Sequence, residues 1–525
     1  MPTRGKRTLT SSAKKLERLT PGSVAEAAFC LDPDRDERAS QLCAEMLLTL
    51  SQNGYAAPAA PDALKSPKRQ RFAIRSLALG WNFLSGRDSG SAGGATPEHY
   101  GALLAAGSQL RGSTNLDVAQ KAMLGLVDPD TQRGQRGVWL LRPFHESLLW
   151  YDARTEGRAT RKYSVRKVQM RGSGITLARI LTQPAEPDSA ALGAAAVDAI
   201  RKALTAHSPF AAISKRLESA LPTGETWTAP PRLEDDEQAS WERGADPRLR
   251  SLTRHLCRHA EGVMGQAGSS GPSCLWQLRS VVALDLALHV LRTAWEITDT
   301  PPADRYLLLG FGGVPRREDP VRQRSEESFR RAKIRISEAM VLTFARRMRE
   351  LKEQERVVDW PAEFQKRSPL GGAAEDSVSS QLARLRRPSE EDYMRIARAG
   401  VESANYSRGA EDGFRVLLES VGLLAGTGAY RYLTASPDLL AAMVGALSAR
   451  MPMSSREFFA AAWEEWGVVV NQESAAKTAL AAQLDGTGLE RNARMAERLM
   501  SEAGLAVGLS DRTTVVGERA ARIPA

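Results

Sequence analysis

Residues 306–313 read Tyr-Leu-Leu-Leu-Gly-Phe-Gly-Gly, and a long arginine-rich segment follows them. From Glu326 to Glu355 this segment contains neither Gly nor Pro, and its apolar residues recur at helical spacing. An apolar run that ends at a glycine turn is typical of a short strand. The sequence therefore predicts a strand that leads into a basic helix about 45 Å long.

The composition favours an anionic partner. The chain has 525 residues, a formal net charge of +10 and a hydrophobic fraction of 42%. A basic excess of this size is most often matched by nucleic acid, so we expect DNA or RNA as a partner. The helical patterns outnumber the strand patterns, which predicts a mainly α (α+β) fold with several domains.

The four cysteines, Cys30, Cys43, Cys257 and Cys274, show no CxxC spacing, so neither disulfides nor a zinc site is expected. The basic N-terminal segment has no apolar region typical of a signal peptide. No stretch approaches the 18 uninterrupted apolar residues of a membrane span. We therefore expect a cytoplasmic protein without a bound metal, a cofactor or a membrane partner.

Changes in composition divide the chain into a basic arm and three domains. We expect the arm at residues 1–20, an N-terminal α+β domain at 21–221, a central helical domain at 248–365 and a C-terminal domain at 392–525. The segment 222–247, which holds the acidic run Glu234-Asp-Asp-Glu, is interpreted as a linker. The last domain ends with two helical patterns and the strand-like Thr513-Thr-Val-Val, an order similar to that of winged-helix modules.

Two basic segments are the expected nucleic-acid contacts. Residues 154–171 read as a β-hairpin with seven basic residues and one acidic residue, Glu156, and such a hairpin could follow a phosphate backbone. The alternative is a solvated edge hairpin whose charges prevent aggregation. On the long helix, glutamates at i,i+4 offer ion pairs to some arginines, which favours a solvated face. The residues that we expect to bind nucleic acid are Arg161, Lys162, Arg166, Lys167, Arg171, Arg330, Arg331, Arg335, Arg346 and Arg347.

Residues 254–259, Arg-His-Leu-Cys-Arg-His, resemble the Arg-polar-three-any-His signature of HEPN ribonucleases. The resemblance implies a helical bundle that cleaves RNA without a metal. Arg254 would stabilise the phosphorane and His259 would be the general acid or base. His255 and His259 also share one helix face, but Cys257 points away from it, so three zinc ligands from this helix are not expected.

No phosphate-binding loop, dinucleotide-binding motif or nuclease core is found, so we expect a binding protein rather than an enzyme. The chain as a whole is similar to uncharacterised components of bacterial anti-phage defence systems. We therefore expect a non-enzymatic nucleic-acid-binding subunit of a larger assembly. The alternatives are a metal-independent ribonuclease that uses Arg254 and His259, and a helical adaptor or scaffold that binds other proteins.

Overall fold

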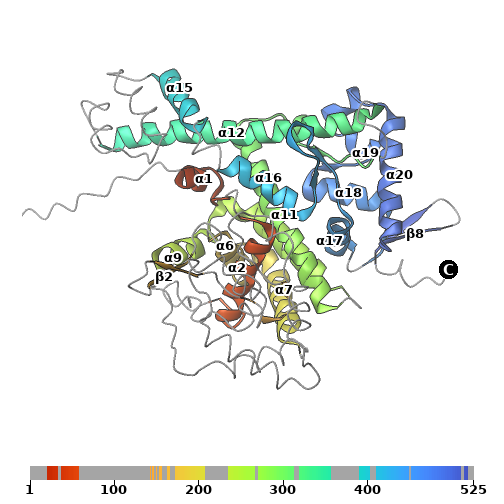
Figure 1. Cartoon of the computed structure of the whole chain (residues 1–525), viewed down its shortest axis with the longest axis horizontal. Helices are drawn as coiled ribbons and strands as arrows, with labels where there is room; N and C mark the ends of the chain where they lie inside the picture. Colours follow the sequence, from red (N-terminus) through yellow and green to blue (C-terminus); the bar gives the residue numbers. More distant parts are fainter. Residues whose placement is uncertain are drawn as a thin grey trace, which may run out of the picture.

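The computed structural model of the chain is mainly helical, as the sequence predicts (Figure 1). It describes residues 21–33, 37–57, 142–143, 145–146, 149, 153–156, 162–165, 172–206, 234–266, 270–312, 318–355, 389–402, 409–448, 451–509 and 513–517. All structural statements below concern these residues.

The centre of the fold is α11 (Gly271–Ile297), which is buried over most of its length. Ser270 caps its first turn by accepting a hydrogen bond from the Ser273 amide. Its most apolar window is hydrophobic enough to cross a membrane, but 89% of that window is buried inside the fold. An apolar helix covered in this way is typical of a protein core.

Helices from the N-terminal half surround one side of α11. They are α1 (Pro21–Phe29), α2 (Ala39–Gln52), α6 (Ser173–Thr182), α7 (Pro187–Thr205), α9 (Glu234–Arg243) and α10 (Arg250–Met264), with the short 3₁₀ turn η4 (Pro247–Leu249) before α10. Helix α9 contains the acidic run that we interpreted as a linker, so part of the expected linker is helical. One buried apolar cluster includes side chains from Val24 to Val516 and draws on all three predicted domains.

A buried carboxylate joins α2 to α6. Glu45 accepts hydrogen bonds from the amides of Gly172 (3.1 Å) and Gly174 (2.8 Å) at the start of α6, where backbone N–H groups have no partner within the helix. A Cβ atom on Gly174 would lie 2.7 Å from the Leu42 carbonyl oxygen. The close approach of the two helices therefore requires glycine at this position.

The predicted strand and long helix are both present. The strand is β3 (Leu307–Leu308), and the helix is α12 (Pro320–Glu355), six residues longer at its N-terminus than expected. Asp319 accepts a hydrogen bond from the Arg322 amide at 3.0 Å and so caps the helix. Helix α12 runs across the molecule and packs against α1, α11 and α15 (Figure 1).

The C-terminal half covers the other side of α11 and α12. Its helices are α15 (Glu390–Val401), α16 (Ala410–Val421), α17 (Pro437–Ser448), α18 (Ser455–Trp466), α19 (Gln472–Ala475) and α20 (Gly486–Glu502). Its strands are β4 (Leu424–Ala425), β5 (Tyr432–Leu433), β6 (Met453–Ser454), β7 (Val468–Val469), β8 (Ala506–Gly508) and β9 (Thr514–Val516). The remaining 3₁₀ turns are η5 (Pro302–Asp304), η7 (Gly428–Tyr430) and η8 (Ala479–Ala482).

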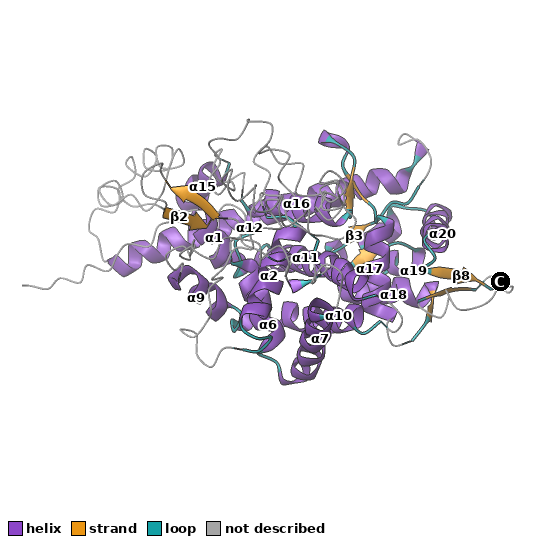
Figure 2. Cartoon of the chain, turned by 60° about the horizontal axis from the view of Figure 1, so that its bottom comes forward, coloured by secondary structure: helices purple, strands orange, loops and turns teal. Residues whose placement is uncertain are grey.

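The strands form four small sheets, of which the β3–β7 pair is buried among the helices (Figure 2). Strands β1 (Ala153–Glu156) and β2 (Lys162–Val165) are antiparallel, as are β4 and β5. Strand β3 pairs in parallel with β7, which follows it by about 160 residues. Strands β6, β9 and β8 form an antiparallel sheet in that order.

Asn492 of α20 holds the β3–β7 pair in place. Its side-chain amide donates to the Leu309 carbonyl (2.8 Å) and to the Val470 carbonyl (2.9 Å). Its oxygen accepts from the Phe311 amide at 2.7 Å. All three hydrogen bonds are buried, so this one side chain satisfies backbone groups at the ends of both strands.

Candidate functional site

The basic segment at residues 154–171 contains an antiparallel pair of strands. Residue pairs run from Ala153 opposite Val165 to Glu156 opposite Lys162. Lys162 is therefore in a strand, while Arg161, Arg166, Lys167 and Arg171 lie outside the described residues. The paired strands agree with the predicted hairpin, and two-stranded ribbons of this kind fit the major groove of DNA.

The arginines of α12 that we predicted as nucleic-acid contacts differ in their surroundings. Arg331 hydrogen-bonds the Tyr306 hydroxyl and lies 3.6 Å from Asp304. Arg335 pairs with Glu338 (2.7 Å) and Arg347 pairs with Glu350 (2.8 Å). Arg330 and Arg346 are exposed and have no ion pair to a described residue. The helix therefore presents fewer available cations than its sequence indicates.

Helices and short strands follow one another at the C-terminal end of the described residues. Along the chain the order is α17, β6, α18, α20, β8 and β9, and the insertion between α18 and α20 contains β7 and α19. Helix α20 is half-buried through Leu489, Asn492 and Ala496. Its other face exposes Arg491, Arg494 and Arg498 at the edge of the molecule. The β8–β9 hairpin lies beside the end of α20 (Figure 1).

The sequence analysis did not identify the exposed arginines of α20 as candidate site residues. Arg494 pairs with Glu490, and Arg498 pairs with Glu502 at 2.8 Å, both at i,i+4. Arg491 has no ion-pair partner among the described residues. Surface pairs of this kind contribute only about 0.3–0.5 kcal/mol, so a phosphate can replace the glutamate as the partner. The signal available in the sequence was the spacing of the three arginines on one helix face.

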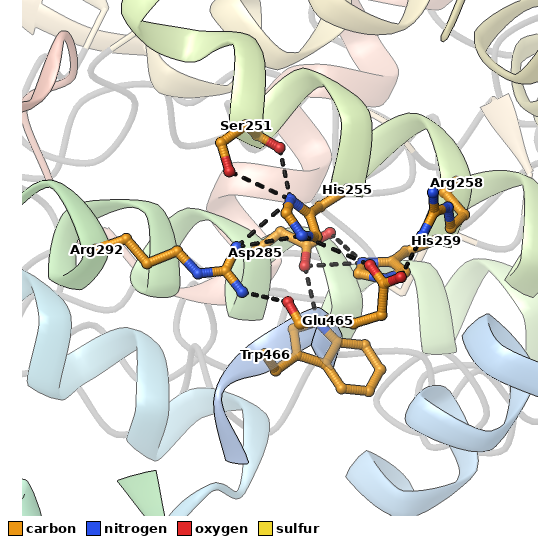
Figure 3. A network of polar contacts seen from close by, with 8 residues as sticks. All are labelled: Ser251, His255, Arg258, His259, Asp285, Arg292, Glu465 and Trp466. Atoms are coloured by element: carbon orange, nitrogen blue, oxygen red, sulfur yellow. Dashed lines mark hydrogen bonds and ion pairs between the residues drawn. The ribbon is translucent and has the colours of Figure 1, made fainter. Parts of the chain in front are cut away.

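A second group of polar residues is buried where α10, α11 and α18 meet (Figure 3). His259 of α10 is 0% exposed, and its Nδ1 donates to the Asp285 carboxylate at 2.9 and 3.0 Å. On the other side, Nε2 lies 3.4 Å from Oε2 of Glu465. The Trp466 indole also donates to Asp285, at 3.0 Å. The imidazole is therefore held between two carboxylates.

Three further residues complete this buried ionic network. Arg258 pairs with the Glu465 carboxylate, and Arg292 donates to the Glu465 backbone carbonyl. His255 donates from Nδ1 to the Ser251 carbonyl at 2.6 Å. The polar contacts of Glu465 and Trp466 that Figure 3 draws join the end of α18 to α10 and α11. The network therefore fixes the C-terminal half on the central helices.

The network determines which of its groups are charged. Burial lowers the pKa of His259, but the carboxylates of Asp285 and Glu465 outweigh burial and raise this pKa to about 9. Burial raises the pKa of Glu465, but His259 and Arg258 outweigh it and lower this pKa to about 2. Burial and the neighbouring Arg292 lower the pKa of His255. At neutral pH, His259 is a cation between two anions.

The two residues of the ribonuclease hypothesis lie in different surroundings. The side chain of Arg254 is 57% exposed and pairs with Glu186 at 3.3 Å, whereas His259 is enclosed by Asp285, Glu465 and Trp466. A general acid or base must reach the proton that it transfers, and His259 reaches only its protein partners here. Within the described part of the chain, no group of three or more His, Cys, Asp or Glu side chains is placed to hold a metal ion.

The sequence analysis did not identify Asp285, Glu465 or Trp466 as partners of His259. One signal was present: Asp285 is the single charged residue in the apolar run 281–288. A carboxylate in the middle of a buried helix requires a cation or several donors, and a histidine on the preceding helix can supply them. Glu465 lies about 200 residues further along the chain, and no local pattern connects it with α10.

Comparisons of the chain with models of protein families, with curated proteins and with solved structures find no match. The resemblances to HEPN ribonucleases and to anti-phage defence components therefore remain predictions.

Proposed function

We propose that the protein is a non-enzymatic nucleic-acid-binding subunit whose C-terminal residues 437–517 act as a winged-helix module. The observation that carries this proposal is the order α17-β6-α18-α20-β8-β9, with β7, α19 and η8 inserted between α18 and α20, together with the sheet order β6-β9-β8. In winged-helix modules the first strand pairs with the last, the third helix enters the major groove and the hairpin forms the wing. This similarity to winged-helix modules concerns topology alone. The proposed function therefore also depends on the residues of the exposed face of α20.

Helix α20 takes the place of the recognition helix. Its buried face packs on α17 and β8 of the module and also on α12 and the β3–β7 pair, whereas Arg491, Arg494 and Arg498 are exposed on the opposite face. Arginine donates two parallel hydrogen bonds to guanine or to phosphate oxygens, which makes it the commonest residue for such contacts. The glutamates beside these arginines repel phosphate, so binding requires that the arginines leave their surface pairs.

The basic ribbon supplies a second contact. Residues 154–171 carry seven basic side chains against Glu156. Nucleic acid can therefore contact basic side chains both at the ribbon and at α20. Two separate contacts favour a ligand long enough to reach both.

Fluorescence anisotropy of the full chain with duplex DNA, single-stranded DNA and RNA over a salt series tests this function. We expect duplex binding, weakened when Arg491, Arg494 and Arg498 are all replaced by alanine. The slope of log affinity against log salt should become shallower by about 0.9 for each phosphate that the variant no longer neutralises. The ribbon variant, in which alanine replaces Lys162, Arg166 and Lys167, should show a similar change.

The control replaces three other exposed arginines that lie outside both contacts, Arg201, Arg254 and Arg395. We expect its affinity and its salt slope to equal those of the wild type. The proposal is wrong if the wild type binds no nucleic acid at low salt. It is also wrong if the control triple weakens duplex binding as much as the α20 triple does.

A further inference from the structure

A groove of about 880 Å³ runs along α12 and is open to solvent. Its other walls come from the end of α11, from α15 and from the first turn of α16. Ile334 lies in the groove with 48% of its surface exposed, and Val341, Leu342 and Met394 add apolar surface. Several apolar side chains that line a concave surface together with polar groups are typical of a binding site.

The groove-facing residues of α12 form a ridge. Arg330, Ile334, Glu338, Leu342 and Arg346 follow one another at intervals of four residues, and all five line the groove. Rows at i±4 are the ridges that pack between the side chains of a second helix. The chemical order along this ridge is cation, apolar, anion, apolar, cation.

The charges of the groove select against nucleic acid. Five basic residues line it, and so do five acidic residues: Asp299, Glu338, Glu390, Glu402 and Glu411. Lys333 pairs with Glu411 at 2.6 Å, and Arg349 pairs with Glu390 at 3.0 Å. A surface that binds a phosphate backbone has an excess of cations, which this groove lacks.

The ridge also selects against a second copy of this chain. A two-fold axis would place the ridge antiparallel to itself, with Glu338 opposite Glu338 and Arg330 opposite Arg346. Arg335 already neutralises Glu338 in each copy, but Arg330 and Arg346 would face each other as like charges, which is repulsive across an interface. The complementary ridge has the order anion, apolar, cation, apolar, anion, and this chain's ridge does not provide it.

We propose that the groove along α12 binds an amphipathic α-helix of a different protein, with apolar residues against Ile334 and Leu342 and carboxylates against Arg330 and Arg346. Neither arginine has an ion pair to a described residue, so both are available to the partner. They lie about 24 Å apart along the helix axis. Recognition of this kind, a helix in a hydrophobic groove, depends on a few apolar anchors and on flanking charges. The proposal is independent of nucleic-acid binding.

The test uses two synthetic helical peptides of ~18 residues, long enough to span both arginines. Both carry leucine along one face and a central lysine; one has glutamate at both ends and the other has lysine there. Their binding to the full chain is measured by fluorescence anisotropy at peptide concentrations up to about 1 mM. We expect the glutamate peptide to bind wild type more tightly than the lysine peptide does.

Substitutions in the ridge should change this preference. Ile334→Ser should lower the affinity for the glutamate peptide about tenfold, because the peptide loses its apolar contact with Ile334. Arg330→Glu with Arg346→Glu should reverse the preference, so that the lysine peptide binds more tightly. Ile334 is half exposed, and both arginines are exposed, so these variants keep the fold.

Two controls match these variants. Met451→Ser removes another exposed apolar side chain, which is 73% exposed. The double variant Arg201→Glu with Arg254→Glu reverses the charge of two exposed side chains elsewhere. Neither control should change peptide binding. The proposal is overturned if neither peptide binds, if both bind equally, or if Ile334→Ser leaves the affinity unchanged. It is also overturned if sedimentation shows a wild-type dimer that Ile334→Ser dissociates, because the occupant would then be a second copy.

Discussion

Replacement of His259 by glutamine should remove a stabilising cation from the buried network. In the folded protein, Asp285 and Glu465 hold the pKa of His259 at about 9, whereas the ordinary value of histidine is 6.5. The folded state therefore binds this proton more tightly than the unfolded state does. Its contribution to stability is complete below pH 6.5 and is lost as the pH rises from 6.5 through 9.

The size of the contribution follows from the difference between the two pKa values. One pKa unit corresponds to about 1.4 kcal/mol, so the difference between 6.5 and about 9 corresponds to about 3 kcal/mol. Glutamine can still donate one hydrogen bond to Asp285, but it cannot neutralise either carboxylate. We therefore expect His259→Gln to destabilise the protein by about 3 kcal/mol near pH 6, and by much less above pH 9.

Urea unfolding followed by tryptophan fluorescence measures this effect at pH values of about 6, about 7.5 and about 9. Trp466 lies against His259, with ring centroids 4.8 Å apart, and reports on this part of the fold. The wild type should lose stability between the first and last pH, and His259→Gln should lose much less. If both proteins lose the same amount of stability over this range, the charge assigned to His259 is wrong.

The other predictions concern single buried groups. Burial lowers the pKa of His289 to about 4, so the wild type should lose about 3 kcal/mol of stability as the pH falls from 6.5 to 4. The His289→Gln variant should lose less stability over the same range, which urea unfolding measures. Asn492→Ala removes all three hydrogen bonds at the ends of β3 and β7 and should cost about 2–4 kcal/mol, measured as a lower urea midpoint with an unchanged slope. Gly262→Ala places a Cβ 2.4 Å from the Ala446 carbonyl oxygen, so α10 and α17 must separate, and thermal unfolding should show a loss of about 1–3 kcal/mol.

Patterns within one segment predicted much of the fold. The absence of Gly and Pro after Glu326 predicted α12, and the short run Thr513-Thr-Val-Val predicted β9. These features depend on neighbours along the chain, whose spacing the sequence shows directly. The prediction placed the start of α12 at Glu326, beyond Pro320, although proline fits the first turn of a helix.

The partners of these elements depend on tertiary contacts and were not predictable. Nothing in the sequence at residues 306–309 specifies β7 as the strand that pairs with β3. Likewise, the sequence shows how many arginines α12 has but not which of them have partners. In the structure Arg331 contacts Tyr306 and Arg335 contacts Glu338. The charge that a ligand meets therefore depends on which cations the fold has already paired.

The parallel pairing of β3 with β7 also affects how the chain folds during its synthesis. The ribosome completes β3 about 160 residues before β7, and at roughly 5–20 residues per second this interval lasts about 8–30 seconds. Asp285 and His259 lack their partners Glu465 and Trp466 for at least as long, because these two residues are synthesised later than β3. Throughout this interval the apolar helix α11 lacks its C-terminal cover, so we expect the nascent chain to be prone to aggregation until translation nears its end.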